Sequence, residues 1–425
     1  MAFDQRPSTP QRIAIIGGGI SGLSAAMLLG RHHRVTLFDR AASFGGHART
    51  VTAGLQGDQP VDTGFIVFNY VTYPHLTRLF DDLGVAVERS DMSFGATLDG
   101  GRIEYALRAP FSQRRNLSRP AFLRMLADIA RFNSRAEALA EADDLTIGDL
   151  IARLKPGAWF SRCYLLPICG AIWSTPPEGI TAFPARALLR FFRNHGLLGI
   201  RGQHQWWTVS GGSIEYVRRL QARIWGQGTG LRPGTQVTAV SRDAAGVTLH
   251  ATGCEPERFD QVVFACHSDQ TLALLTDPDP EERAALSAIR YQPNRAVLHR
   301  GTAQMPRHRA CWSSWIYRGT TTGPNEARPI GLTYWMNRLQ NIPEEDPLFV
   351  TLNPAEPIRD ELIYDETVFH HPVFDHAALA VQSKIAARQG QNRSWFAGAW
   401  LRNGFHEDGI ASAHHILREM ERQAV

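Results

Sequence analysis

The sequence predicts an α/β fold of two lobes, one of which binds a dinucleotide. Three observations lead to this prediction: a glycine-rich turn after an apolar strand, an acidic residue after the next strand, and two long inserts with a different pattern. The turn lies in the segment Arg12–Gly22, which reads RIAIIGGGISG. Its Gly17-x-Gly19-x-x-Gly22 spacing follows the strand and opens a helix predicted over Ile20–Gly30.

Each glycine of this turn has a physical reason. Gly17 makes the tight turn, Gly19 lets the backbone approach a pyrophosphate, and Gly22 lets the helix pack closely on the sheet. The helix N-terminus presents free N–H groups and the positive end of its dipole to phosphates. A second predicted strand, Arg34–Phe38, leads to Asp39, whose carboxylate would accept hydrogen bonds from a ribose. The alternative is an ordinary glycine-rich turn without a ligand.

The residues after Asp39 favour one dinucleotide. A second glycine pair, Gly45-Gly46, follows it, and a further turn lies at Val61–Phe65. A simple NAD lobe does not need these extra close approaches, whereas FAD does, because its ribityl chain and ring continue past the pyrophosphate. A plain loop rich in glycine is the competing interpretation.

Composition describes an ordinary globular protein. The chain has 425 residues, 44% hydrophobic and 20% charged, with a formal net charge of +4. Its five cysteines are scattered without a CxxC pair, which argues against a disulfide framework or a cysteine metal site and for a reducing cytosol. The uncharged run Ile13–Gly30 contains five glycines, so a strand and a helix explain it better than a membrane span. No signal peptide pattern precedes it, and we therefore expect a cytoplasmic protein.

The pattern along the chain divides it into two discontinuous lobes. Strand and turn patterns predict a dinucleotide lobe from residues 1–70, 206–290 and 390–425. Residues 71–205 and 291–389 would form the second, substrate-binding lobe, with a helix over Pro120–Ala140 and strands at Ala296–His299, Ile330–Trp335 and Leu348–Leu352.

Segments spread over nearly the whole chain resemble a known superfamily. The opening glycine motif, the Gly45-Gly46 pair and the closing Gly398…Asp408-Gly409-Ile410 resemble the flavin-containing amine oxidases and phytoene-desaturase-like proteins. Six further segments resemble one subgroup, the predicted FAD-binding proteins associated with cyclopropane-fatty-acid-synthase-like methyltransferases; they are residues 68–74, 90–94, 170–174, 333–340, 370–374 and 404–409.

The resemblance implies a two-lobed fold and an activity. The fold would combine a glutathione-reductase-type Rossmann domain that binds FAD with an α+β substrate-binding domain. The activity implied by the subgroup is desaturation of methylated fatty acyl chains in membrane lipids, with a lipid methyltransferase as a possible partner. Two alternatives stay open: oxidation of a small amine, and a flavin-bound protein that supports the methyltransferase without catalysis.

The resemblance also implies which residues hold FAD. His47 stands where the superfamily has arginine, so Arg49 would take the phosphate role, and Asp39 stands where glutamate is more common. The segment Asp408–Ile410 would start a helix aimed at the N1–C2=O edge of the flavin. The implied FAD contacts are Gly17, Gly19, Ile20, Ser21, Gly22, Asp39, Arg40, Gly45, Gly46, His47, Arg49, Gly64, Phe65, Val237, Gly398, Asp408, Gly409 and Ile410.

His406 is the candidate catalytic base. Amine oxidases of the superfamily hold the amine between two aromatic rings and place a lysine near flavin N5. Here the second aromatic position matches His406, and the only lysines, Lys155 and Lys384, lie outside the matching strand context at Tyr291–His299. Both differences count against amine oxidation. Imidazole titrates near neutral pH, as a base requires, but His406 could instead only hydrogen-bond the turn before the last helix.

Other side chains have weaker assignments. Glu407 and Asp408 are expected to cap the final helix, and His370-His371 would either line the substrate channel or form a structural pair. Trp173, Tyr334 and Trp335 are expected in the second lobe, as core or channel wall. No zinc site is expected, because the 16 histidines have no acid or cysteine partners at ligand spacing.

Two basic, apolar stretches raise the question of membrane contact. Residues 108–135 carry seven arginines and one acid, Asp128, and residues 183–198 place three arginines on one helical face. Such a helix could lie on the inner face of an anionic bilayer, or it could be a solvated face over a core. The expected ligand is a lipid or another small-molecule substrate, with possible peripheral membrane contact. Nucleic acid is not expected as a partner. Without a second GxGxxG, no NADPH domain is expected.

Overall fold

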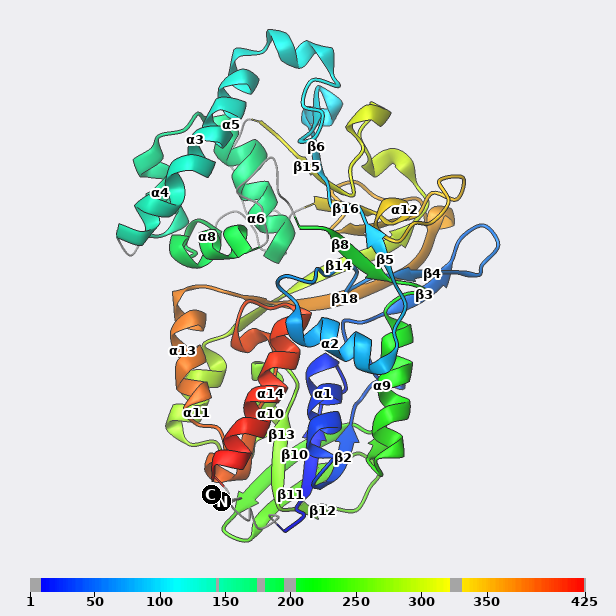
Figure 1. The fold of residues 1–425 in the computed structure, drawn as a ribbon, viewed down its shortest axis with the longest axis vertical. Helices are drawn as coiled ribbons and strands as arrows, with labels where there is room; N and C mark the ends of the chain where they lie inside the picture. Colours follow the sequence, from blue (N-terminus) through cyan, green and yellow to red (C-terminus); the bar gives the residue numbers. More distant parts are fainter. Residues whose placement is uncertain (1–8, 143–144, 174–179, 195–203, 322–330, 424–425) are drawn as a thin grey trace, which may run out of the picture.

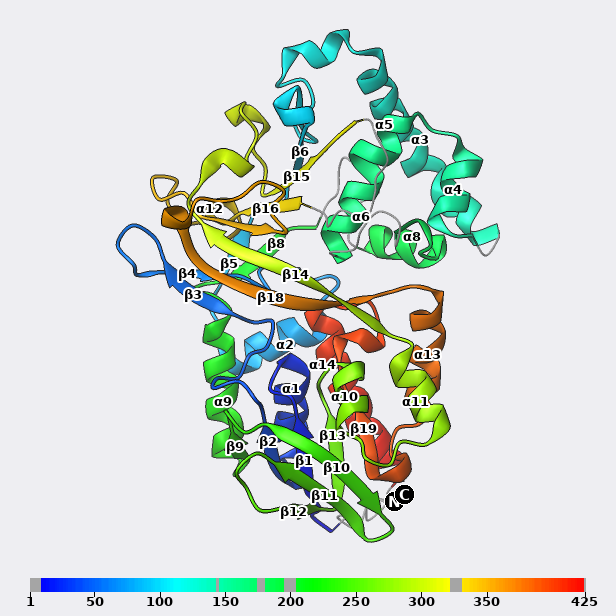
Figure 2. The ribbon, with the colours of Figure 1, turned by 180° about the vertical axis from the view of Figure 1, so that it is seen from behind.

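The computed structural model describes residues 9–142, 145–173, 180–194, 204–321 and 331–423. Two lobes are stacked along the long axis of the molecule (Figure 1). We call the lower one the dinucleotide lobe and the upper one the substrate lobe. The long strands β14 (Arg290–His299) and β18 (Ile363–Val373) run from one lobe into the other, as Figure 2 shows from behind.

The dinucleotide lobe is built on a five-stranded parallel sheet. The strand order is β19-β13-β1-β2-β9, so strands far apart in the sequence lie side by side. The bounds are β1 Arg12–Ile16, β2 Arg34–Phe38, β9 Gly230–Arg232, β13 Gln261–Phe264 and β19 Ser394–Phe396.

Strand β1 explains why this sheet is sandwiched between two layers. Ile13 and Ile15 pack into one apolar cluster, whereas Ala14 and Ile16 pack into another on the opposite face. A parallel strand that is buried on both faces reads as a continuous apolar run, as this one does. Helix α1 (Ile20–Leu29) buries nine of its ten residues against the first face.

Helices and a small sheet cover the two faces. The first face carries α1, α2 (Pro74–Leu83), α9 (Ile214–Gly226) and α14 (His406–Gln423), whose apolar residues share one cluster. The second face carries the antiparallel sheet β10-β11-β12 and helices α11 and α13. The bounds there are β10 Val237–Asp243, β11 Gly246–Ala251, β12 Glu257–Phe259, α10 Ser268–Leu274, α11 Pro280–Ser287 and α13 His376–Ala386.

Two helices differ from the predicted division into lobes. Helices α2 and α13 lie in segments that were predicted for the substrate lobe, but they pack on the dinucleotide lobe (Figure 1). Leu76, Leu79 and Phe80 of α2 enter the cluster with α1, and Val381 and Ile385 of α13 enter the cluster with β13. Burial of these amphipathic faces decides their placement, and the order of residues along the chain does not reveal it.

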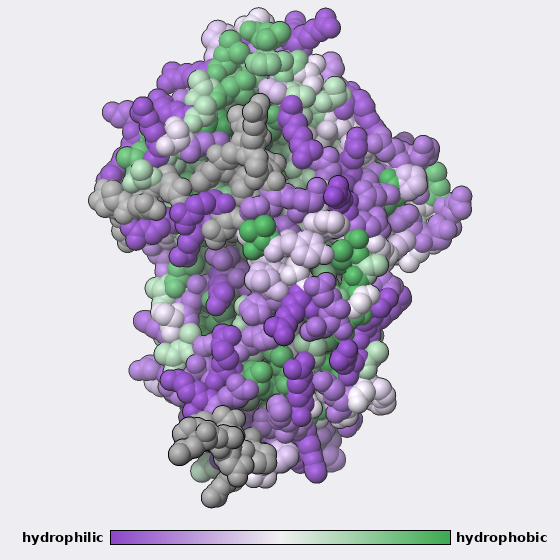
Figure 3. Space-filling view, in the orientation of Figure 1, coloured by the Kyte–Doolittle hydropathy of each residue, from purple (hydrophilic) through white to green (hydrophobic). Residues whose placement is uncertain are grey.

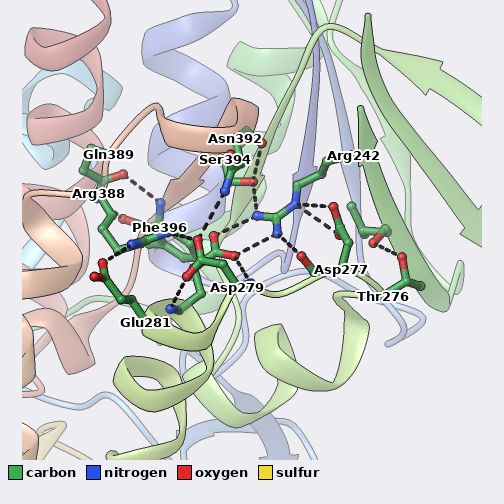
Figure 4. A network of polar contacts seen from close by, with 12 residues as sticks. Arg242, Thr276, Asp277, Asp279, Glu281, Arg388, Gln389, Asn392, Ser394 and Phe396 are labelled. Carbon is green, nitrogen blue, oxygen red and sulfur yellow. Dashed lines mark hydrogen bonds and ion pairs between the residues drawn. The ribbon is translucent and has the colours of Figure 1, made fainter. Parts of the chain in front are cut away.

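An ion-pair network, buried at Arg242 and Glu282, holds three segments of the dinucleotide lobe together (Figure 4). Arg242 of β10 pairs with Glu282 of α11 at 2.8 Å and with Asp277 at 3.2 Å, and it donates to Ser394 of β19 at 3.1 Å. Arg388, just after α13, pairs with Asp279 and with Glu281. The network therefore links strands and helices that lie up to 152 positions apart.

The substrate lobe contains a seven-stranded mixed sheet. Its order is β18-β14-β17-β16-β15-β6-β7, and all pairs are antiparallel except β15 with β6. The remaining bounds are β6 Phe94–Leu98, β7 Ile103–Ala106, β15 Trp315–Gly319, β16 Gly331–Trp335, α12 Met336–Leu339 and β17 Phe349–Leu352.

A helical layer packs against this sheet in the large apolar cluster of the lobe. It consists of α3 (Pro120–Ala142), α4 (Ile147–Leu154), α5 (Ala158–Phe160), a π-helical turn (Ser161–Leu165), α6 (Leu166–Trp173) and α8 (Ala185–Asn194). Leu188, Leu189 and Phe192 of α8 are at most 1% exposed. Within α8, the second basic stretch is therefore a solvated face over a core, because these apolar side chains are buried; its residues 195–198 lie outside the described ranges.

Two small sheets join the lobes. Strands β3 (Thr50–Ala53) and β4 (Gln59–Asp62) form a hairpin, and β5 (Val87–Ser90) pairs with β8 (Trp206–Val209). No helix in the described part of the chain is long and apolar enough to cross a membrane.

Candidate functional site

The turn between β1 and α1 has the close contacts that its glycines predict. Gly17 adopts φ = 110°, a conformation that favours glycine. A Cβ added to Gly22 would lie 1.8 Å from the carbonyl oxygen of Gly17, so helix α1 can approach the turn only without a side chain there. The N-terminus of α1 carries no side-chain cap and no acid in its first turn. Its N–H groups can therefore bind an anion.

The second glycine pair lies against the first turn. The Gly45 N–H donates to the Gly18 carbonyl at 2.9 Å, and a Cβ added to Gly46 would come within 3.0 Å of the Gly19 Cα. Two backbone turns thus meet at the N-terminus of α1 without intervening side chains. Such a cradle fits a pyrophosphate group, and Ile20 and Ser21 begin the helix that faces it.

The adenosine end of the predicted FAD site contains Asp39 and Val237. One Asp39 carboxylate oxygen accepts from the Gly18 N–H at 2.6 Å and the other from Ala41 N–H at 2.8 Å. The Asp39 carbonyl accepts from Thr235 N–H at 2.8 Å, which brings the start of β10, with the buried Val237, beside the end of β2. Arg40 is exposed next to this carboxylate.

The opposite end of the site is formed by the N-terminus of α14. A Cβ added to Gly409 would lie 2.8 Å from Ser21 Oγ, so the first turns of α1 and α14 are in contact. Gly398 N–H donates to Ser412 Oγ at 3.0 Å, and Ile410 is 1% exposed. The first turns of α1 and α14 therefore meet at one place, from segments almost 400 residues apart.

Asp408 and Glu407 act as caps, but on different helices. Asp408 accepts from the N–H groups of Phe405 and Asn403, the turn just before α14, and burial raises the pKa of its carboxyl to about 6. Glu407 instead accepts from the N–H groups of His75 and Leu76, at the N-terminus of α2. The expectation that both acids cap the final helix is therefore wrong for Glu407.

His406 lies at the first position of α14 and faces Phe65. The two rings are stacked with centroids 3.9 Å apart and an interplanar angle of 16°. His406 Nε2 lies 3.0 Å from the hydroxyl of the fully buried Tyr216. Burial, with a smaller contribution from His47, lowers the pKa of His406 to about 3. The imidazole is therefore neutral at physiological pH, but it does not titrate near neutrality, as the role of a base was expected to require.

The Gly64-Phe65 turn is fixed by its neighbours. Phe65 N–H donates to the His47 carbonyl at 2.7 Å, and a Cβ on Gly64 would come within 2.1 Å of that oxygen. Just before the turn, buried Asp62 accepts from the N–H and hydroxyl of Ser213, the residue that precedes α9. These bonds place Phe65 against His406.

Three more histidines gather beside this pair. The His47 ring centroid lies 6.1 Å from that of His267 and 5.5 Å from that of His371. His267 stacks on Tyr291 at 4.3 Å, and Asn294 Nδ2 donates to His371 Nδ1 at 2.9 Å. Burial lowers the pKa of His47 to about 4 and the pKa values of His267 and His371 to about 3. The site is therefore lined by neutral imidazoles.

Sequence reasoning missed Tyr216 and His267 as site residues. His267 follows the end of β13 at the carboxyl edge of the parallel sheet, where ligands of open α/β sheets bind. That position is a signal that could have identified it. Tyr216 carried no such signal, because its partner His406 lies 190 positions away.

Several predicted residues lie elsewhere. Arg49 forms a bidentate ion pair with Asp365 of β18, at 2.6 and 3.0 Å, so its proposed phosphate contact stays a prediction. His370 is exposed, and Trp335 is buried in the sheet core. Tyr334 packs edge-on against Trp315 at 5.0 Å. The side chain of Trp173 lies outside the described residues.

The described residues contain neither a lysine nor a metal cluster at this site. Lys155 ends α4 and Lys384 lies on α13, and both are exposed on the surface. No group of three histidine, cysteine or acidic side chains that could hold a metal ion occurs within the described ranges.

Comparison with known proteins adds a family to this geometry. Residues 20–299, about two thirds of the 425, match the flavin containing amine oxidoreductase family. A curated relative, the carotenoid phi-ring synthase of Chlorobaculum tepidum, is 34% identical over 90 residues, which cover 21% of this chain and only 13% of that protein.

Solved structures share the fold over almost the whole chain. A putative protoporphyrinogen oxidase from Exiguobacterium sp. 255-15 has a TM-score of 0.72 at 16% identity, covering 97% of this chain and 99% of that one. A CLA-producing fatty acid isomerase from P. acnes has a TM-score of 0.68 at 17% identity, with coverages of 98% and 100%. Cyclohexylamine oxidase from Brevibacterium oxydans IH-35A has a TM-score of 0.66 at 16% identity, with coverages of 97% and 100%. These likenesses confirm the predicted fold class.

Proposed function

The chain belongs to the flavin-containing amine oxidoreductase family, and we propose that it desaturates a fatty acyl chain, most simply a methylated chain of a membrane lipid. Its membership makes it an FAD-dependent oxidoreductase. The observation that carries the choice of substrate is the chemical character of the site. Neutral imidazoles and aromatic rings line it, and both lysines of the chain lie on the surface.

The glycine cradle and the two helix N-termini would hold the cofactor. The backbone at Gly17, Gly19 and Gly46 and the first turn of α1 would bind the pyrophosphate, and the first turn of α14 would face the flavin ring. When bound, FAD supplies an acceptor for one hydride at its N5. The protein residues must position the substrate C–H bond, exclude water and take up the proton that leaves the adjacent carbon.

We assign His406 as the group that accepts the proton. Its ring is neutral, and in the tautomer that donates from Nε2 to the Tyr216 hydroxyl, Nδ1 keeps a lone pair. Among the described residues, Nδ1 has no hydrogen-bond partner. In the proposed reaction one C–H bond gives up a hydride, the neighbouring C–H bond gives up a proton to His406, and a carbon–carbon double bond forms. Tyr216 positions the imidazole.

The walls beside this site favour an apolar substrate. Ile66 and Phe369 are each 8% exposed and share the apolar cluster of the substrate lobe with the partly buried Val67 and Phe405. An aliphatic chain can lie against such side chains without losing hydrogen bonds to water, whereas an ammonium group would require a polar partner. Two compared proteins are named for a fatty acid and a carotenoid, which are also hydrophobic molecules.

Anaerobic mixing of the purified, flavin-loaded protein with candidate substrates tests the proposal. We expect phospholipids with methylated acyl chains to bleach the oxidised flavin and to yield products lacking two hydrogens by mass spectrometry. A matched panel of mono- and polyamines serves as the comparison. Bleaching by an amine and not by any acyl lipid would overturn the proposal in favour of amine oxidation.

A partnership with a lipid methyltransferase remains a separate proposal. If the protein only supports such an enzyme, a strain carrying His406→Ala should keep its lipid products, while deletion of the whole protein should change them. If the protein is the desaturase, both strains should lose the same products. Comparing the fatty acids of the two strains decides between these roles.

A further inference from the structure

A basic pocket lies at the outer end of the substrate lobe, away from the dinucleotide lobe. It is open and has a volume of about 760 Å³. The tight turn η1 (Asp99–Gly101), which joins β6 to β7, forms one wall, and the short helix η2 (Arg114–Ser118) forms another. The arginines that line it are Arg102, Arg114, Arg115 and Arg307, and His308 also belongs to the lining.

The charge of this pocket is not neutralised by the described part of the chain. Arg102, Arg114, Arg115 and Arg307 make no ion pair with any described residue. Asp99 is the one acid in the lining, and its two carboxylate oxygens accept from the N–H and hydroxyl of Thr321. Four unpaired guanidinium groups around one pocket create a positive electrostatic potential that attracts anions.

The pKa of the neighbouring Arg119 also reflects the positive charge around the pocket. Arg119 bonds to Gln113, Asn116 and the Arg102 carbonyl, just behind the pocket. Burial lowers its pKa, and the nearby Arg115 and Arg102 lower it further. Glu104 is fully buried, and its two carboxylate oxygens accept hydrogen bonds from the backbone N–H groups of residues 307 and 308.

Apolar side chains project beside these arginines. Phe111, Leu117 and Leu123 are 37%, 57% and 43% exposed, and all three belong to the segment that forms η2 and the start of α3. Phe122 and Met125, which are at most 1% exposed, form the buried face of α3, so the three exposed side chains are not needed for its packing. Figure 3 shows a hydrophobic patch at the top of the molecule, where Figure 1 draws this cyan segment, with hydrophilic residues around it.

We propose that this tip of the substrate lobe docks on an anionic phospholipid bilayer, with a headgroup phosphate in the basic pocket and Phe111, Leu117 and Leu123 in the outer acyl region. Guanidinium groups bind phosphate through two parallel hydrogen bonds. Exposed aliphatic and aromatic side chains beside a cationic surface are the pattern of proteins that lie on membranes. A nucleic acid would match the charge, but not the leucines.

Vesicle co-sedimentation with the full-length, flavin-loaded protein tests this surface. We expect binding to vesicles that contain phosphatidylglycerol, weak binding to pure phosphatidylcholine, and a fall in binding as salt rises. Each basic residue near an anionic surface changes the partition coefficient about fivefold. Arg114→Glu with Arg115→Glu should therefore lower it at least tenfold, and Leu117→Ser with Leu123→Ser should also lower it.

Matched controls lie on the dinucleotide lobe. Arg283 on α11 and Trp225 on α9 are exposed, so Arg283→Glu and Trp225→Ser should leave vesicle binding unchanged. All exchanged residues are exposed, and an unchanged melting temperature verifies folding. Equal loss of binding in the controls and the tip variants would overturn the proposal.

A soluble phosphate source is distinguished in the same assay. Inorganic phosphate and glycerol phosphate at millimolar concentration should not replace vesicles as ligands for the tip. If they bind the pocket while vesicles of either composition stay unbound, the site is a small-anion site and membrane docking is wrong. Because the assay needs no turnover, its failure leaves the proposed desaturation untouched.

Discussion

Arg242 and Glu282 form a bidentate ion pair in the interior of the dinucleotide lobe, with both N–O distances at 2.8 Å and side chains that are 3% and 2% exposed. Replacement of Arg242 by methionine leaves the Glu282 carboxylate buried without its counterion. We expect Arg242→Met to lower the free energy of unfolding by about 3–5 kcal/mol. Urea titration followed by fluorescence measures the change.

The control for this prediction lies in the small antiparallel sheet that contains β10. Arg258 of β12 pairs with Asp243, but both side chains are about half exposed. Arg258→Met should leave the stability unchanged within error, because exposed pairs contribute little. Equal effects of the two substitutions would show that burial does not decide the contribution of Arg242.

The glycine turn gives a second prediction, on cofactor binding. Gly22→Ala would place a methyl group 1.8 Å from the Gly17 carbonyl oxygen, so α1 must move away from the turn. We expect a protein without bound flavin that is destabilised by about 3 kcal/mol or more. Gly226→Ala on α9, where a Cβ meets nothing within 4 Å, should keep its flavin absorbance and its melting temperature.

His299 gives a prediction for the pH dependence of stability. It is fully buried, accepts from Gly301 N–H at Nδ1, and lies 2.8 Å from the Thr351 hydroxyl at Nε2. Burial lowers its pKa from 6.5 to about 4. As pH falls below 6.5, the unfolded chain binds a proton that the native imidazole rejects, so stability is lost between pH 6.5 and 4.

The expected loss from this one residue is on the order of 2–3 kcal/mol across that range. His299→Gln should therefore reduce the difference in unfolding free energy between pH 7.5 and about 4.5, whatever its effect at neutral pH. The exposed His376 is the comparison, and His376→Gln should preserve the wild-type difference. A His299 variant with the full wild-type pH dependence would contradict the assignment.

His406 and Tyr216 give a prediction for catalysis. His406→Ala should lower the rate of acyl-chain desaturation about a hundredfold or more, as expected for loss of a general base, while keeping bound FAD. Tyr216→Phe should lower kcat about tenfold with little change in KM, because the hydroxyl only orients the imidazole. Steady-state turnover with an artificial electron acceptor measures kcat and KM, and single-turnover bleaching of the flavin measures the rate of the chemical step. An unchanged rate in His406→Ala would remove the histidine from the mechanism.

The first βαβ unit was predictable because its information is local. The strands Arg12–Ile16 and Arg34–Phe38 lie where the apolar runs predicted them, and α1 ends one residue before the predicted Gly30. Turn chemistry, apolar run length and the acid at 39 all occur within 30 residues. The final helix was predicted to start within Asp408–Ile410 but begins at His406, where Asp408 caps the preceding turn.

The rest of the fold and of the candidate site could not be predicted, because it depends on contacts between residues far apart in the sequence. The contact between His406 and Tyr216, the stacking of His267 on Tyr291 and the packing of α13 on the dinucleotide lobe join residues whose proximity depends on the completed fold. The basic pocket is likewise assembled from three separate segments, at Asp99–Arg102, at Ser112–Arg115 and at Arg307-His308. The sequence showed that the second segment is rich in arginine, but it did not show that these arginines line a pocket together with the other two segments.

The distribution of the proposed FAD cradle along the chain has a consequence for its biosynthesis. The turn at Gly17–Gly22 leaves the ribosome early, but β19 and the first turn of α14 are translated only after residue 390. Until then the parallel sheet lacks its edge strand and the second helix end. If both helix ends hold the flavin as proposed, its stable insertion follows translation, and the nascent polypeptide carries an empty glycine turn for most of its synthesis.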